Sequence, residues 1–105
     1  MRIEQIGDWT LEDRLAIHKT PVVVRFMETG EKGAASRRDF LRVASEHPQA
    51  RFYEIDLVEN PSLARRYAIT QVPMVIVFIN GAETARQTGN LMATTVDRAL
   101  GDSST

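Results

Sequence analysis

The side chains that most often perform covalent chemistry are scarce in this chain. Its 105 residues include no cysteine, which excludes disulfides, thiolate nucleophiles and thiolate metal sites. The two histidines, His18 and His47, lack the spacing of a zinc site. Glu31, Glu54 and Asp56 carry carboxylates, but their spacing builds no acid/base pair and no substrate pocket. The sequence therefore predicts no metal site, no cofactor and no catalytic residue.

The composition is that of one compact domain. Hydrophobic residues make up 43% of the chain and charged residues 26%, which is globular rather than disordered composition. The formal net charge of −1 gives no field that favours nucleic acid or an anionic membrane. No apolar run reaches the roughly 18 residues of a spanning helix, and residues 1–5 contain no signal-peptide core. We expect one cytoplasmic domain over residues 1–100, followed by a disordered tail, 101–105.

Hydrophobic patterning predicts the strands. The β-branched run 22–27 and the run that follows Pro73, up to residue 79, are typical of strands buried on both faces. The segment 51–57 alternates and contains two aromatic residues that favour a strand. The dipeptide Asn80-Gly81 is a strong hairpin signal, so we expect residues 83–88 to return antiparallel.

Capping residues and breakers predict the helices. We expect a first helix with Thr10 as its N-cap and a second from Ala34 to the residues before Pro48. A third begins at Asn60-Pro61, with the asparagine as N-cap and the proline in the first helical position. A final helix buries the face that carries Val96 and Leu100.

The predicted elements alternate in the order helix, strand, helix, strand, helix, strand, hairpin, strand, helix. Strands joined through helices are expected to be parallel with right-handed crossovers, whereas the hairpin is antiparallel. A short additional strand at residues 3–6 would be a fifth. This order favours a mixed sheet covered by helices on both faces.

The element order, at this length, resembles that of the thioredoxin-like family over roughly residues 6–100. The segment 21–26 is similar to the family's strand before the active site. Further family positions are matched by Asn60-Pro61, Tyr67, Val72-Pro73, Phe78, Asn80-Gly81 and Gly89. The resemblance implies an α/β thioredoxin-like fold with a mixed central sheet of four to five strands, helices on both faces, and a cis-proline loop before the antiparallel hairpin.

The departures from the family concern its chemistry. Thioredoxins carry Trp-Cys-Gly-Pro-Cys where this chain has Gly30-Glu31-Lys32-Gly33-Ala34, so Glu31 and Ala34 replace both cysteines. Disulfide exchange needs an attacking thiolate and a second thiol to resolve the mixed disulfide. The resemblance therefore implies a redox-inactive member. Ala34 is either native or an engineered replacement for cysteine.

A second departure is electrostatic. Arg25 occupies the place of the family's buried aspartate, and Glu54 falls where bacterial thioredoxins have the facing lysine, so acid and base have exchanged strands. A buried charge is unfavourable by several kcal/mol unless it is paired. The resemblance therefore implies a buried pair between Arg25 and Glu54. The alternative is that Arg25 extends to solvent from the end of its strand.

In the family, three loops form a shallow groove for extended polypeptide, and the resemblance implies that this recognition survives without the thiols. Main-chain hydrogen bonds would provide affinity, and pockets for side chains would provide a preference for particular partner residues. Adaptable methionines at positions 27, 74 and 92 would add contact area, unless they belong to the core. The predicted groove residues are Glu31, Lys32, Gly33, Ala34, Val72, Pro73, Met74, Gly89, Asn90, Leu91 and Met92.

Two classes of function follow. The first is a monomeric, non-catalytic module that binds a protein or extended peptide, and neither nucleic acid nor a membrane, as a chaperone, adaptor or assembly factor. Cysteine-free hydrogenase-maturation chaperones show a similar loss of the thiol pair. The second is an enzyme that uses the fold without thiols, such as a glutathione-binding transferase, for which the site offers only Thr29 and Ser36. A structural domain of a larger assembly is a third possibility.

Overall fold

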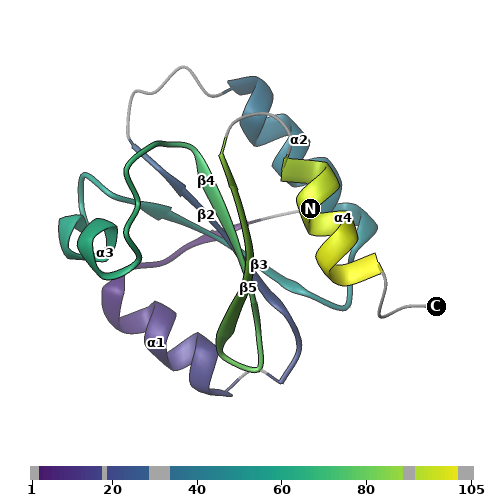
Figure 1. Cartoon of the computed structure of the whole chain (residues 1–105), viewed down its shortest axis with the longest axis horizontal. Helices are drawn as coiled ribbons and strands as arrows, with labels where there is room; N and C mark the ends of the chain where they lie inside the picture. The colour runs from purple at the N-terminus through teal and green to yellow at the C-terminus, as the bar shows by residue number, and fades with distance from the viewer. Residues whose placement is uncertain (1–2, 18, 29–33, 89–91, 102–105) are drawn as a thin grey trace.

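The computed structural model describes residues 3–17, 19–28, 34–88 and 92–101. These residues form one sheet in the order β1-β3-β2-β4-β5 and four helices (Figure 1). The strands are β1 (Glu4–Gln5), β2 (Val22–Met27), β3 (Arg51–Asp56), β4 (Met74–Ile79) and β5 (Ala82–Thr88). The helices are α1 (Asp8–Ile17), α2 (Ala34–Glu46), α3 (Pro61–Arg66) and α4 (Met92–Gly101).

The sheet is mixed, as the sequence predicts. The strands β1 and β2 each pair in parallel with β3, whereas β4 is antiparallel to both β2 and β5. The central strands β2, β3 and β4 are buried along nearly their whole length. Their near-continuous apolar character follows from this position, because each of their faces is covered.

Each face of the sheet has its own hydrophobic core, and Figure 1 shows the two helical layers on opposite sides. Leu11 of α1 and Leu63 of α3 pack with Val24, Phe26 and their neighbours on one face. On the other face, side chains of α2 and α4 pack with the sheet: Phe40, Val43, Ala44, Val96 and Leu100. The chain thus has helices on both faces, as expected.

The hairpin between β4 and β5 forms at the predicted dipeptide. Asn80 has φ of 53° and Gly81 has φ of 81°, and a two-residue turn with both φ values positive is of the type that matches the twist of the flanking strands. The two strands that it joins are antiparallel, with Ile79 opposite Ala82.

One predicted helix start is wrong, and a second is correct in position but lacks the capping bond that the sequence predicts. Helix α1 begins at Asp8, so Thr10 lies inside it rather than at its N-cap, because the N–H of Leu11 already bonds to the carbonyl of Gly7 at 2.9 Å. At α3, Pro61 is in the first turn as predicted, but the side chain of Asn60 makes no capping bond. It donates instead to the carbonyl of Asp56 at 3.0 Å.

At the C-terminal end, Gly101 is the last residue of α4. The predicted tail therefore begins one residue too early, because the helix continues through Gly101. Residues 102–105 lie outside the described part of the chain, so the prediction of a disordered tail stays a prediction.

Candidate functional site

The strand ends that flank the predicted groove meet at one end of the sheet. Met74, the first residue of β4, lies opposite Phe26 of β2 and Thr88 of β5. This register places Met27 and Glu28, the end of β5, and the segment before Met74 side by side. Of the predicted groove, residues 31–33 and 89–91 lie outside the described part of the chain, as do the side chains of Ala34 and Met92.

The segment Val72-Pro73 precedes β4 at this end of the sheet. Both residues are half-buried, and the peptide bond between them is cis. Among the described residues, neither the N–H nor the C=O of Val72 takes part in a hydrogen bond. A backbone donor and acceptor without partners in the described fold are the groups that pair with an extended chain in strand-like recognition.

A hollow of about 200 Å³ lies beside this segment. The strand end at Glu28, the loop after β3, helix α3 and the chain leading to Val72 all contribute to its wall. Its lining residues are Glu28, Leu57, Pro61, Ala64, Ile69, Thr70, Gln71 and Val72. Its volume suits one side chain rather than a whole small-molecule ligand, for which pockets of roughly 300–1,000 Å³ are usual.

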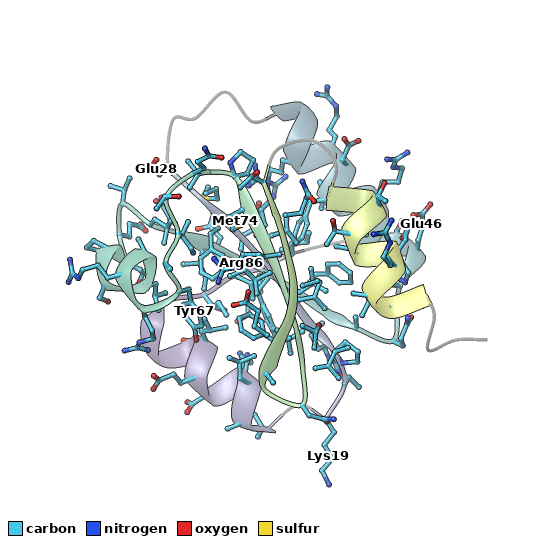
Figure 2. All side chains as sticks on the ribbon, in the orientation of Figure 1. Lys19, Glu28, Glu46, Tyr67, Met74 and Arg86 are labelled. Atoms are coloured by element: carbon cyan, nitrogen blue, oxygen red, sulfur yellow. The ribbon has the colours of Figure 1, made fainter. Side chains whose placement is uncertain are left out.

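Of the three methionines predicted near this surface, Met74 belongs to the core, and the side chain of Met92 lies outside the described residues. The side chain of Met74, labelled in Figure 2, belongs to the core and is 6% exposed. It shares a face of β4 with Ile76 and Phe78, because alternate residues of a strand point to the same side. Met27 is half-buried at the end of β2. For Met74 the alternative that it belongs to the core is therefore confirmed, so its side chain is not a contact surface, although its backbone lies at the end of the sheet beside Val72-Pro73.

Arg25 and Glu54 form a buried ion pair across the parallel strands β2 and β3. They lie in register, and Arg25 Nη1 donates to Glu54 Oε2 at 2.9 Å. The two side chains are only 2% and 1% exposed, so Arg25 does not extend to solvent. The burial of these two charges is tolerated because each has the other at hydrogen-bond distance.

A second arginine reaches the same carboxylate. Arg37 of α2 lies with Nη2 3.4 Å from Glu54 Oε1, an oxygen that accepts no hydrogen bond from the described residues. The Arg37 side chain is 49% exposed, so it covers the buried pair from the side of α2. The sequence does not predict this contact; its one signal is the place of Arg37 near the start of α2, the helix that follows β2.

The remaining buried carboxylate has a structural partner. Asp56 Oδ1 accepts the N–H of Val58 at 2.8 Å and so stabilises the turn between β3 and α3. Across the residues that the structure describes, no three histidine, aspartate or glutamate side chains are grouped so that they could hold a metal ion. Thr29 lies outside the described residues, as does the side chain of Ser36. The alternative hypothesis, an enzyme that uses the fold without thiols, therefore stays a hypothesis.

Comparison with known proteins links this geometry to one fold. A thioredoxin of Mycoplasma genitalium is 31% identical over 58 residues, which are 55% of this chain and 57% of that protein. The chain thus matches just over half the length of this curated relative. Chloroplastic thioredoxin z superimposes with a TM-score of 0.83 at 25% identity, covering 97% of this chain and 94% of that one. No protein-family model matches the chain.

Two further thioredoxins show the same architecture. The Fasciola hepatica protein has a TM-score of 0.83 at 19% identity, over 95% of this chain and 98% of that one. Mitochondrial thioredoxin 3 of Saccharomyces cerevisiae has a TM-score of 0.82 at 18% identity, over 95% of this chain and 94% of that one. The chain therefore has the thioredoxin fold and contains no cysteine.

The absence of cysteine decides one reaction that this protein cannot perform. Exchange with a substrate disulfide requires a sulfur nucleophile and a resolving thiol, and the chain has neither. The ion pair beneath α2 does not replace them, because an arginine stays protonated and moves no proton at ordinary pH. Among the described helices, none combines the length and the apolar character that crossing a membrane requires.

Proposed function

We propose that this thioredoxin-like protein is a non-catalytic module that binds an extended segment of a partner protein. The observation that carries the proposal is the backbone of Val72, whose N–H and C=O have no hydrogen-bond partner among the described residues. The site lies at the end of the sheet, beside the hollow of about 200 Å³. The chain keeps this arrangement although it has no cysteine for it to serve.

An extended chain laid along Val72 would pair with its backbone and place one side chain into the hollow. Its apolar lining includes the buried or half-buried Leu57, Ala64 and Ile69, which we take as its floor, whereas the polar lining residues Glu28, Thr70 and Gln71 are exposed. An aliphatic side chain of the partner therefore fits the floor, and polar neighbours fit its border. In this way the backbone of Val72 would provide affinity, and the hollow would provide a preference for the partner's side chain.

The competing surface consists of the arginine-bearing faces of α2 and α3. Two of its members already have acidic partners: Arg37 contacts Glu54, and Arg66 pairs with Glu12 at 2.5 Å. Their charges are therefore partly compensated within the fold. This observation supports the sheet end over the helix faces as the docking surface.

The experiment is a titration followed by backbone amide shifts. The probe is a permanently unfolded polypeptide, reduced and carboxymethylated α-lactalbumin, and native α-lactalbumin is its folded control. We expect shifts at Val72 and Met74 with the unfolded probe only. Shifts confined to Arg37, Arg38, Arg65 and Arg66, with residues 72–74 silent, would contradict the proposal.

A pair of variants tests the role of the hollow. Ala64→Leu should fill it and weaken binding of the unfolded probe several-fold, because the partner side chain loses its place. Ala16→Leu is the matched control, since Ala16 is an exposed helical alanine that does not line the hollow. Equal affinities for the two variants would show that the hollow takes no part in binding.

We further propose that the protein acts as a monomer in the cytoplasm, as a chaperone, adaptor or assembly factor. Sedimentation of the purified chain tests whether it is a monomer. Affinity purification with the wild type and Ala64→Leu side by side identifies the partner, which should be retained by the wild type alone.

A further inference from the structure

A bulge in β5 places two opposite charges on one face of the sheet. The register between β4 and β5 shifts between Val77 and Phe78, so that Arg86 lies opposite Ile76 while Glu83 lies opposite Phe78. In a regular strand, side chains three positions apart point to opposite faces. The extra residue in β5 turns Glu83 to the face that Arg86 occupies.

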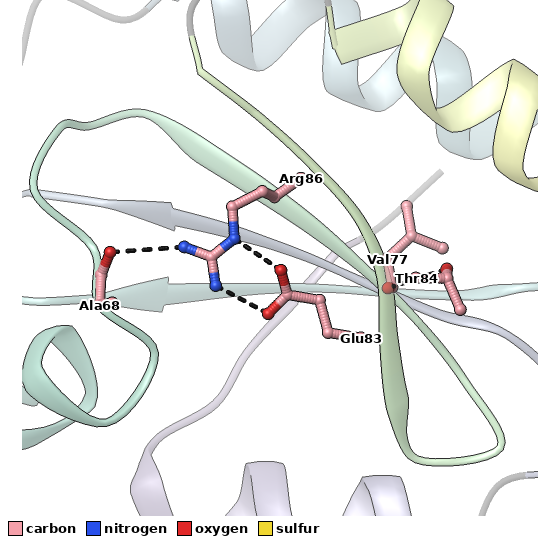
Figure 3. A network of polar contacts seen from close by, with 5 residues as sticks. All are labelled: Ala68, Val77, Glu83, Thr84 and Arg86. Atoms are coloured by element: carbon pink, nitrogen blue, oxygen red, sulfur yellow. Dashed lines mark hydrogen bonds and ion pairs between the residues drawn. The ribbon is translucent and has the colours of Figure 1, made fainter.

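The two side chains form a bidentate ion pair. Arg86 Nε donates to Glu83 Oε2 at 2.6 Å, and Nη2 donates to Oε1 at 2.7 Å. Figure 3 shows that the third nitrogen, Nη1, points away from the carboxylate to the carbonyl oxygen of Ala68, at 3.4 Å. Glu83 thus holds the guanidinium plane in the orientation that directs Nη1 at the chain beyond α3.

Ala68 stands at the end of α3 in a conformation that an L-residue rarely adopts. Its φ is 53°, in the left-handed region that usually favours glycine. The N–H of Ala68 bonds to the carbonyl of Arg65 at 3.3 Å, and that of Ile69 to the carbonyl of Ala64 at 2.8 Å. These two bonds are the pattern that closes a helix with a left-handed residue.

The peptide group that joins Ala68 to Ile69 is therefore fixed from both sides. Its N–H is held by α3, and its C=O accepts the bond from Arg86 of β5. The residues that follow it, from Ile69 to Val72, line the hollow and end at the backbone of Val72 in the proposed site. The direction of this peptide group sets the path of the chain toward Val72.

We propose that Arg86, oriented by Glu83, is a positioning residue for the partner-binding segment 69–72. The effect on the segment rests on the contacts described above, and its consequence for partner binding rests on the proposed function. The alternative is that the ion pair stabilises only the hairpin between β4 and β5, with no effect on the segment.

A charge swap distinguishes the positioning role of Arg86 from a role in the hairpin alone. The double variant Glu83→Arg with Arg86→Glu keeps an ion pair on β5, but a glutamate at position 86 has no proton to donate to the carbonyl of Ala68. Arg86→Met removes both interactions. Arg42→Met is the matched control, because Arg42 forms an exposed ion pair with Asp39, also three positions away, on α2.

The first readout is amide hydrogen exchange at Ile69, with the core amide of Ile76 as the reference for global unfolding. We expect exchange at Ile69 to rise about fivefold relative to Ile76 in both β5 variants, the effect of losing one hydrogen bond. Arg42→Met should leave the ratio unchanged. A wild-type ratio in the charge-swapped protein, or a rise at Ile69 that Ile76 follows equally, overturns the positioning role.

The second readout is the affinity for carboxymethylated α-lactalbumin, which we expect to fall several-fold in both β5 variants. Faster exchange at Ile69 with unchanged affinity, while Val72 still shifts in the wild type, overturns the inference and leaves the proposed function standing. A silent Val72 in the wild-type titration overturns the proposed binding site itself, whatever happens at Ile69.

Discussion

Two of the arginine–glutamate pairs in the described part of the chain differ sharply in their setting. The pair Arg25–Glu54 joins two strands of the interior and is 2% and 1% exposed. The pair Arg86–Glu83 lies within the edge strand β5, with both side chains about one-third exposed. In the interior each charge depends on the other, because no solvent replaces a lost partner. At the edge, water screens both charges.

The comparison teaches that an ion pair between the same two residue types can serve two purposes. Breaking the interior pair leaves a desolvated charge and threatens the fold as a whole. Breaking the edge pair leaves two hydrated groups, so its effect is local and depends on what the guanidinium orients. The predictions below test this contrast, from the largest expected effect to the smallest.

Glu54→Leu should be the most damaging single change. It removes the carboxylate that the buried Arg25 contacts at 2.9 Å, and that Arg37 approaches. We expect a loss of about 3–5 kcal/mol in the free energy of unfolding, measured by urea denaturation. The double variant with Arg25→Met and Glu54→Leu removes both charges and should lose much less. Equal losses in the single and double variants would show that the pair is not desolvated.

Arg25→Met alone should be milder than Glu54→Leu. Arg37 stays near Glu54, and because it is half-exposed it can move toward the abandoned carboxylate. We expect a loss at the lower end of the same range, about 3 kcal/mol. Adding Arg37→Met should then deepen the loss by more than Arg37→Met does in the wild type. Additive losses would contradict the role of Arg37 as a second partner.

Ala68→Gly should stabilise the protein by about 1 kcal/mol. Ala68 has positive φ, which is unfavourable for an L-residue and free of strain for glycine. The gain is reduced by the greater freedom of glycine in the unfolded chain. Thermal unfolding measures this gain in stability. The control is Ala16→Gly, at an exposed position of α1 where glycine is unfavourable. A destabilised Ala68→Gly would show that the left-handed conformation is not retained.

Glu83→Gln should have the smallest effect, about 0.2–1 kcal/mol at pH 7. Hydrogen bonds from Arg86, and then its charge, hold the pKa of Glu83 below its ordinary value of 4.5, against the effect of partial burial. Because the folded-state pKa is lowered, this contribution is complete above pH 4.5 and is lost as the pH falls through the folded-state pKa.

The measurement is the difference in unfolding free energy between wild type and Glu83→Gln at pH 7 and at pH 3. It should shrink at the lower pH, where the unfolded-state carboxyl is protonated. A difference that is the same at both pH values would mean that the carboxylate charge does not act through Arg86.

The parts of the fold that could be predicted depend on local pattern. The apolar run 22–27, the alternating run 51–57 and the turn Asn80-Gly81 each specify an element through neighbouring residues, and each is found as predicted. The start of α1 was missed because Asp8 also caps or begins a helix well, and the choice depends on a bond from Leu11 to Gly7.

The parts of the site that could not be predicted depend on register. The alternation in β5 shows no extra residue, so nothing in the sequence places Glu83 and Arg86 on one face. Ala68 gives no glycine signal for its left-handed backbone. Met74 follows the proline as expected, but whether its side chain faces the core or the surface depends on pairing with β2 and β5.

The two borders of the sheet differ in length but share a property that matters when many copies are crowded together. At one border, β1 has only two residues. At the other, β5 carries the bulge at the level of Val77 and the charges of Glu83 and Arg86. Short, kinked or charged borders discourage another chain from extending the sheet. Concentrated solutions of the native protein should therefore resist growth into fibrils of joined sheets, although the apolar strands at its centre are well suited to such growth once they are unfolded.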